Sequence, residues 1–197
     1  MTSAELKAYL VRFLSSFKEL SEADIKQLSV SIRMKFCKKG EILVREGDFC
    51  NECYFVLKGC LRKYEIKDGN EITSAFYMEQ EAAILFTPLK TKSPSSSFLV
   101  CAEDCILILG NLEEEKEAYT NFPHLAEITR KMMEVDMGKL QEKLTHFINS
   151  NAEERYLDLI KNKPELLKRV PQHQIASYIG ISAESLSRIR RKIALKS

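Results

Sequence analysis

The sequence predicts an α+β protein in which a β-rich region, a long helix and a helix-turn-helix follow one another along the chain. Residues 34–109 contain short runs of Val, Ile, Phe and Tyr that are separated by glycines. Several short strands at this spacing are typical of a sandwich or a barrel-like roll. Apolar residues recur every three or four positions after Pro123, and Gly180 separates two short amphipathic segments. Both of these later patterns predict helices.

The first 110 residues divide into two helices and a set of strands. Leu and Phe recur at helical spacing over residues 3–30, and Ser21 to Asp24 is a capping sequence that opens the second helix. Asp68-Gly69-Asn70 between alternating runs is a strong hairpin signal. Two prolines and four serines in residues 87–97 predict a polar loop. The predicted strand regions are residues 41–45, 53–58, 61–66, 71–78 and 98–109.

The long helix predicted from Pro123 to Asn149 has one apolar stripe. A helix of this length with such a stripe usually packs against another helix, often the same helix of a second copy. The alternative is that the stripe covers its own chain, and both can hold at different points. Ser150 to Glu153 fits a capping box, which predicts a helix restart and a hinge. The stripe consists of Leu125, Ile128, Met132, Val135, Leu140, Leu144 and Phe147.

The helix-turn-helix is predicted over residues 169–192. Gly180 supplies the sharp bend, because a residue without a Cβ adopts positive φ at little cost. Ser182 stands where an N-cap belongs, and Leu186 turns inward on the second helix. The second helix of such a motif lies in the DNA major groove. The alternative is an ordinary helical hairpin with a solvated basic face.

The charge of the chain is unevenly distributed, although its formal net value is only +2. From Arg130 to the end there are 14 Lys and Arg against 8 Asp and Glu, whereas the rest of the chain has 16 against 20. Such asymmetry suits a polyanion partner at the C-terminal end. No apolar run approaches the ~20 residues that span a bilayer, and the N-terminus lacks a secretory signal pattern. We therefore expect a cytoplasmic protein without a membrane partner.

Six cysteines raise the question of disulfides and metals. A cytoplasmic setting argues against disulfides. Cys50 and Cys53 have metal-ligand spacing with Cys60 close by, so an iron–sulfur or zinc site is one alternative. Cys53, Cys101 and Cys105 lie in apolar runs, where a thiol behaves as a small buried hydrophobic group. We expect structural thiols and no metal site.

Three motifs, together with the order of the elements, give the chain a family resemblance. The motifs are KGEILVREG at residues 39–47, YFVLKG at 54–59 and QIASYIGISAESLSR at 174–188. Over residues 10–195 the chain resembles the Crp/Fnr family of bacterial transcription regulators. The resemblance implies a jelly roll (double-stranded β-helix) like that of cyclic nucleotide-binding domains at residues 1–120, a dimerisation helix at 121–149 and a winged helix-turn-helix domain at 150–197. It also implies double-stranded DNA, a second copy of the chain and RNA polymerase as partners.

The segment that would bind an effector departs from the family pattern. Members that bind cyclic nucleotides carry a segment resembling F-G-E-x-x-L and then R-[ST]-A, in which the Glu accepts the ribose hydroxyl and the Arg pairs with the phosphate. Here Glu81 matches the Glu, Gln80 replaces the Gly, and Ser95 or Ser96 falls at the Arg. The resemblance assigns Glu81, Ser95, Ser96 and Ser97 to an effector site that does not bind cyclic AMP in the usual way. The alternatives are an unknown small-molecule effector or no effector at all, and no cofactor is assigned.

The residues expected to contact DNA match the family better. Glu184 can accept a hydrogen bond from cytosine, and Arg188 can donate two to guanine; the alternative is an ion pair between the two on a free surface. The candidates are Gln172, His173, Ser182, Glu184, Ser185, Ser187, Arg188, Arg191 and Lys192. The sequence thus predicts an effector-responsive, DNA-binding transcription regulator. A rival hypothesis is a small-molecule sensor that acts through a protein partner, with cyclic-nucleotide binding retained in altered form. We expect no enzyme, because the three His are scattered.

Overall fold

The chain begins with two capped helices, α1 (Ser3–Leu14) and α2 (Glu22–Ser31). The computed structural model describes residues 1–195, apart from the side chains of residues 86, 87, 90, 112, 113 and 115. Thr2 with Glu5 and Ser21 with Asp24 form capping boxes at the two helix starts. Each box satisfies two backbone N–H groups that a helix start leaves unpaired. Both helices were predicted.

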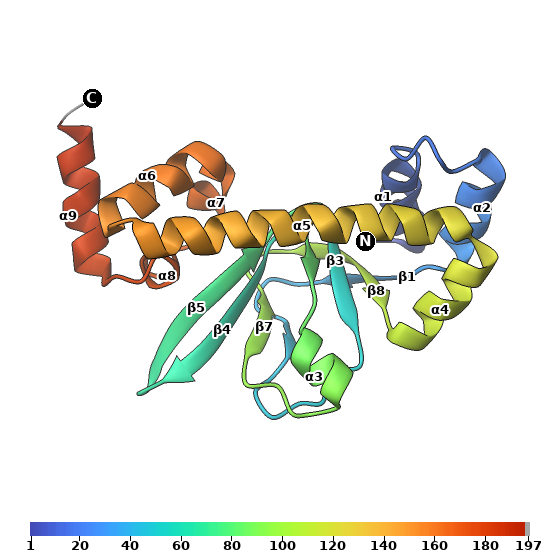
Figure 1. The fold of residues 1–197 in the computed structure, drawn as a ribbon, viewed down its shortest axis with the longest axis horizontal. Helices are drawn as coiled ribbons and strands as arrows, with labels where there is room; N and C mark the ends of the chain where they lie inside the picture. The colour runs from blue at the N-terminus through green and yellow to red at the C-terminus, as the bar shows by residue number, and fades with distance from the viewer. Residues whose placement is uncertain (196–197) are drawn as a thin grey trace.

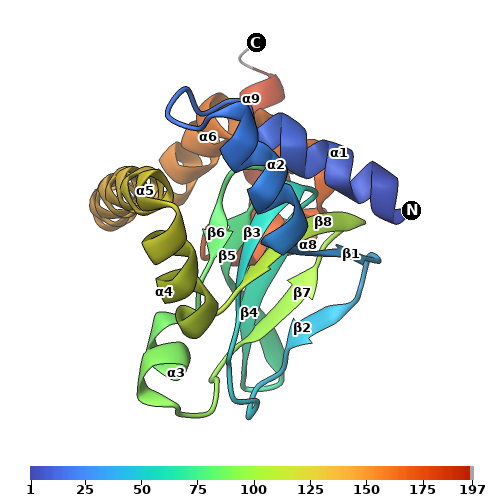
Figure 2. The ribbon, with the colours of Figure 1, turned by 90° about the vertical axis from the view of Figure 1, so that its right-hand side faces the viewer.

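The β-rich region forms a roll of two antiparallel sheets (Figures 1 and 2). One sheet has the strand order β1-β8-β3-β6 and the other β2-β7-β4-β5. Val56, Leu61, Leu99 and Leu107 fill the core of the roll and are fully buried. This confirms the predicted roll. The strands are β1 (Arg33–Cys37), β2 (Ile42–Val44), β3 (Cys53–Lys58), β4 (Leu61–Lys67), β5 (Asn70–Tyr77), β6 (Ala82–Ala83), β7 (Phe98–Cys101) and β8 (Cys105–Gly110).

The β4–β5 turn of the roll follows its sequence signal, residues 98–109 contain two strands with a turn between them, and one segment has a different structure from the one predicted. Asp68 and Gly69 have φ values of 53° and 76° and form the predicted β4–β5 hairpin turn. The exception is α3 (Phe86–Thr91), which occupies part of the segment that was predicted as a polar loop. Leu85 is buried in the core of the roll, and its carbonyl accepts from the Leu89 N–H at 3.0 Å. This tertiary anchor makes a helix of a segment whose composition indicates a loop.

The long helix α5 (Pro123–Asn149) has the predicted bounds and follows α4 (Leu112–Asn121). It crosses the molecule from the N-terminal helices at one end to the C-terminal helices at the other (Figure 1). Proline suits its first position, where the missing N–H has no helical partner to lose. Among the described residues, no helix is both long and apolar enough to cross a bilayer.

Residues 150–195 form a helical C-terminal lobe. Its helices are α6 (Ala152–Asn162), α7 (Pro164–Arg169), α8 (Gln172–Tyr178) and α9 (Ala183–Ala194). The N-cap of α6 is Asn151 and not Ser150, because the Asn151 side chain accepts the Glu154 N–H at 3.1 Å.

The helix-turn-helix is confirmed as α8 and α9, which Gly180 joins with a φ of 76°. The wing that the resemblance implied is absent from the described part of the lobe, which contains helices only. Within the lobe, Pro164 begins the short helix α7, because the fixed φ of proline favours a helix start.

Candidate functional site

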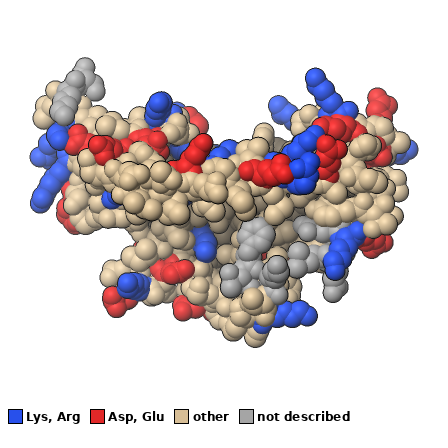
Figure 3. Space-filling view, in the orientation of Figure 1, with Lys and Arg blue, Asp and Glu red and all other residues tan. Residues whose placement is uncertain are grey.

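The second helix of the motif, α9, lies at one end of the molecule with its charged face outward (Figures 1 and 3). Glu184, Arg188, Arg191 and Lys192 are exposed, whereas Leu186 is 1% exposed. The Ser182 hydroxyl accepts the Ser185 N–H at 3.2 Å, which is the predicted N-cap. Alternating faces of this kind fix one side of the helix against the lobe and leave the other side free for a partner.

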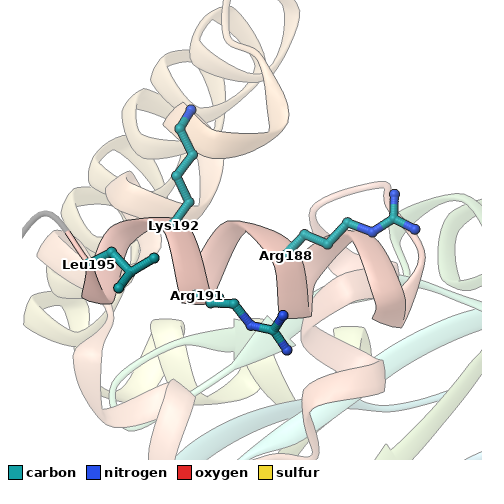
Figure 4. A pocket seen from close by; sticks show the side chains of 4 residues that line it. All are labelled: Arg188, Arg191, Lys192 and Leu195. Carbon is teal, nitrogen blue, oxygen red and sulfur yellow. The ribbon is translucent and has the colours of Figure 1, made fainter.

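The charged face of α9 contains a shallow hollow lined by Arg188, Arg191, Lys192 and Leu195 (Figure 4). In Figure 4, Lys192 extends upward from the helix, whereas Arg188 and Arg191 extend toward the right of the view. Lys192 forms an ion pair with Glu153 on α6. Arg188 and Arg191 are therefore the better placed of the three cations for a ligand that approaches α9.

Glu184 does not depend on Arg188 for its charge. Its pKa is lowered first by the backbone N–H at the start of α9, then by the Ser182 hydroxyl, with the charge of Arg188 contributing least. The ion pairs found among the described side chains do not include one between Glu184 and Arg188, and the charge of Arg188 acts on Glu184 without a hydrogen bond between them. The geometry therefore leaves both groups available, in contrast to the alternative in which they pair with each other.

The first helix of the motif, α8, anchors the lobe. Ile175 and Ala176 are at most 2% exposed and pack with Leu186 of α9. Gln172 and His173, at the start of α8, are exposed, as DNA-backbone contacts require. The structure thus brings the start of α8 and the charged face of α9 into one lobe. Ser187 is exposed, and Ser185 is half-buried at the cap.

The residues assigned to an effector site already have partners within the chain. Ser95 and Ser97 are 3% and 2% exposed; the Ser95 hydroxyl donates to the Ser97 carbonyl at 2.8 Å and accepts its N–H. The Ser97 hydroxyl donates to Glu65. Glu81 accepts from Lys163 of the C-terminal lobe at 2.7 Å. Ser96 is exposed.

These residues do not fit a cyclic nucleotide bound in the usual way. A cyclic phosphate needs a cation with several donors, such as Arg, at the position that Ser95 and Ser96 occupy. The buried arginine of the roll, Arg62, is opposite Phe76 in the β4–β5 register, and Phe76 packs against the C-terminal lobe. Arg62 therefore lies on the outer face of the roll, where it donates to Thr73 and Glu71.

The apolar stripe of α5 is divided between two surroundings. Ile128 is 4% exposed, and Leu125 and Met132 pack beside it against α1 and α2. These three residues cover their own chain, which was the alternative interpretation. The remaining stripe residues stay exposed: Val135 at 56%, Leu140 at 65%, Leu144 at 59% and Phe147 at 45%. Because Arg155 stacks on Phe147, the stripe residues left free for a second copy of the chain are Val135, Leu140 and Leu144.

The six cysteines form no disulfide in the described part of the chain. Cys37, Cys60, Cys101 and Cys105 are at most 1% exposed. Burial raises the pKa of the Cys60 thiol to about 12. Cys53 donates to the Gly110 carbonyl. Among the described side chains, no group of three His, Cys, Asp or Glu is arranged to hold a metal ion.

Sequence reasoning missed the residues that hold the C-terminal lobe against the roll. Lys163, Arg169 and Ser177 bond to residues of the roll that lie 66 to 106 positions earlier in the chain. Arg155 bonds to carbonyls at the end of α5 and at the turn after α8. No local pattern marks these four residues, because their partners come close only when the lobe docks.

Comparison with known proteins places the roll in a family. Residues 34–114 match the family of cyclic nucleotide-binding domains. The anaerobic regulatory protein of Haemophilus influenzae is 24% identical over 184 residues, which are 86% of this chain and 70% of that protein. A human voltage-gated delayed rectifier potassium channel, KCNH8, is 25% identical over 162 residues, which are 81% of this chain but only 14% of the channel.

A solved structure from Eubacterium rectale, assigned to the Crp/Fnr family of transcriptional regulators, shares the fold. Its TM-score is 0.65 at 18% identity, over 92% of this chain and 88% of that one. The alignment with this solved structure covers more of the chain than the family match at residues 34–114, so it extends beyond the roll. The chain therefore has a cyclic nucleotide-binding domain in its roll, and it shares the fold of that Crp/Fnr regulator through the long helix and the helical C-terminal lobe as well.

Proposed function

We propose that the chain is a sequence-specific DNA-binding transcription regulator that acts as a homodimer. The observation that carries the proposal is the exposed face of α9, which presents Glu184, Arg188 and Arg191 while Leu186 anchors the helix. The names of the relatives, an anaerobic regulatory protein among them, support a regulatory role. The proposal therefore includes no enzyme activity. DNA as the partner implies that the protein works in the cytoplasm. Contact with RNA polymerase stays a prediction.

The side chains of α9 suggest a division of labour on DNA. Arg188 is the candidate for two hydrogen bonds to guanine, and Glu184 for one from cytosine. Arg191 is suited to phosphates, which position a protein on the duplex without reading sequence. Gln172 and His173 at the start of α8 are placed for further phosphate contacts, because they are exposed. Lys192 would have to leave Glu153 to contribute.

The exposed half of the α5 stripe supports a dimer. Leu140 and Leu144 belong to a row of exposed apolar side chains that also includes Met133, Met137 and Ile148, and Figure 3 shows an uncharged band along this part of the surface. Apolar rows at helical spacing are the usual seam between two parallel helices. In a symmetric dimer, two α9 helices about 34 Å apart would enter successive major grooves of a palindromic site.

The test is selection of bound duplexes from a random pool, followed by binding titrations with the enriched sequence. We expect a palindromic consensus and steep salt dependence. Replacing Arg188 by Ala should weaken binding by about 1–3 kcal/mol and relax the preference at one base pair per half-site. The matched control is Lys168→Ala, which removes an exposed cation of the same lobe on α7 instead of α9.

No enrichment of any sequence, or identical titrations for the wild type and Arg188→Ala, would overturn the proposal. That result would favour a sensor that acts through a protein partner.

A further inference from the structure

Three carboxylates at two turns of the roll contact two cations of the C-terminal lobe. Glu79 and Glu81 lie in the turn between β5 and β6, and Glu103 lies in the turn between β7 and β8. Arg169, the last residue of α7, donates two hydrogen bonds of 2.8 Å to the two oxygens of Glu79, and it also bonds to Glu103. Lys163, after α6, donates to Glu81 at 2.7 Å. These five residues are here termed the acidic latch.

Backbone N–H groups of the roll orient two of the three carboxylates of the acidic latch. The Gly59 N–H donates to Glu79 at 2.8 Å, and the Met78 N–H donates to Glu81 at 2.8 Å. Arg169 is 19% exposed in its side chain, so that its bonds are partly shielded from solvent. A two-point arginine–carboxylate pair fixes direction as well as distance. The acidic latch therefore defines one orientation of the lobe.

Apolar and backbone contacts between β5 of the roll and α8 of the lobe add to the contact made by the acidic latch. Phe76 of β5 packs edge-on against Tyr178 of α8, with ring centroids 5.2 Å apart. Ser177 of α8 bonds to β5, the edge strand of its sheet: its hydroxyl accepts the Thr73 N–H at 2.8 Å and donates to the Glu71 carbonyl at 3.0 Å. A single serine thus satisfies backbone groups that an edge strand leaves unpaired.

The lobe is also tied to the end of α5. The Arg155 guanidinium donates to the Ser150 carbonyl at 2.7 Å and to the Ile179 carbonyl at 3.0 Å, and it stacks on Phe147. The hinge predicted at Ser150 is therefore clamped in this arrangement. Docking of the lobe does not cover the charged face of α9, because Glu184 and Arg188 remain exposed.

We propose that the acidic latch holds the C-terminal lobe on the roll in the orientation that binds DNA, so that this chain needs no small molecule to orient α9. Two observations support this. Glu81 and Ser95, which the resemblance assigned to an effector, are bonded within the chain. The docked lobe leaves α9 open to the duplex. The statement that this orientation binds DNA rests on the proposed function, whereas the statement that the acidic latch docks the lobe on the roll does not.

The test compares the wild type with Glu79→Gln/Glu103→Gln, a double variant that keeps side-chain size and an acceptor for the Gly59 N–H. The matched control is Glu165→Gln, which removes an exposed partner of Lys168 within α7. Hydrogen exchange should be at least ten-fold faster in the double variant at the Thr73 amide and in residues 170–181. Affinity for the enriched duplex, measured without any added nucleotide, should fall about ten-fold. The control should match the wild type in both.

Unchanged exchange in the double variant would overturn the acidic latch itself. Faster exchange with unchanged DNA affinity would overturn its role in orienting α9, and so would wild-type protein that binds the duplex only after cyclic AMP is added. If the wild type binds no duplex at all, the proposed function fails, and the exchange measurement still decides whether the acidic latch holds the lobe.

Discussion

The two halves of α5 carry similar side chains and have opposite surroundings. In residues 123–132, Leu125, Ile128 and Met132 pack in one cluster with leucines of α1 and α2 and with phenylalanines of α1 and of the segment after it. In residues 133–149, apolar side chains at the same spacing face solvent, with Leu140 65% exposed and Ile148 70% exposed. One amphipathic stripe therefore serves as core at one end of the helix and as a free surface at the other.

The difference follows from what the rest of the chain covers. The N-terminal helices lie beside the first half of α5 only, and the C-terminal lobe contacts its end (Figure 1). Exposed apolar patches of this extent are typical of interaction sites. The first half should therefore govern the stability of one chain, and the second half should govern its assembly.

The largest expected effect comes from charges placed in the second half. Leu140→Glu combined with Leu144→Glu should convert the dimer to a monomer, because in a symmetric dimer each carboxylate would face its own copy across an apolar seam. Operator affinity should then fall more than 100-fold, since only one half-site is bound. Analytical ultracentrifugation gives the assembly state, and titration gives the affinity.

The matched control for this prediction is Thr145→Glu with Asn149→Glu. These two exposed positions lie on a different side of α5 from the row that contains Leu140 and Leu144, so the same two charges should leave the assembly state unchanged. A wild-type chain that stays monomeric at all concentrations would contradict the prediction.

In the first half, Ile128→Ala should lower the free energy of unfolding by about 2–5 kcal/mol, the usual range for truncating a buried aliphatic side chain to Ala. Ile128 is 4% exposed, whereas Val135 is 56% exposed. Val135→Ala should therefore change the stability of the monomeric Leu140→Glu/Leu144→Glu background by less than about 0.5 kcal/mol. Urea denaturation of both variants in that background measures the contrast, and equal effects would refute the division of α5.

Lowering the pH should destabilise the docked C-terminal lobe before it destabilises the N-terminal end of α5. Burial alone would raise the pKa of Glu79, but hydrogen bonds from Arg169 and the Gly59 N–H outweigh it and lower the pKa below its usual 4.5. The contribution of Glu79 to stability is therefore present above that value and is lost as the pH falls through the lowered pKa. Glu103, Glu81 and Lys163 lie in the same contact, and the buried Cys60 thiol nearby stays neutral in acid.

The cluster around Ile128 is held by apolar contacts, and the ion pairs of Lys131 with Glu127 and Glu19 beside it are exposed to solvent. Lowering the pH below the usual Glu range should therefore speed hydrogen exchange in residues 170–181 before it speeds exchange in residues 123–132. Simultaneous loss of protection in both segments would show that the C-terminal lobe and the N-terminal end of α5 unfold as one unit.

Local signals in the sequence predicted much of this arrangement. Pro123 marked the start of α5, Gly180 the turn of the helix-turn-helix, and Asp68-Gly69 the hairpin, because each of these residues has a backbone preference that acts within a few positions. α3 was missed, since its order comes from the burial of Leu85 in the roll.

The acidic latch could not be predicted, because Arg169 and Glu79 are 90 positions apart and meet only through the docking of one lobe on another. The division of the α5 stripe into a buried and an exposed half could not be predicted for the same reason. The sequence showed the periodicity of the stripe, but which of its residues α1 and α2 cover depends on the tertiary fold.

The smallest expected effect lies near the boundary between the two halves of α5. Gly138 is helical, and a Cβ built there would meet no atom within 4 Å. Glycine in a helix interior costs about 0.5–1 kcal/mol relative to Ala, so Gly138→Ala should raise the free energy of unfolding by that amount. Measured in the Leu140→Glu/Leu144→Glu monomer, the gain should appear in full. In the dimer it should be smaller or reversed if Gly138 lets the two α5 helices approach closely, and an equal gain in both backgrounds would place Gly138 outside the seam.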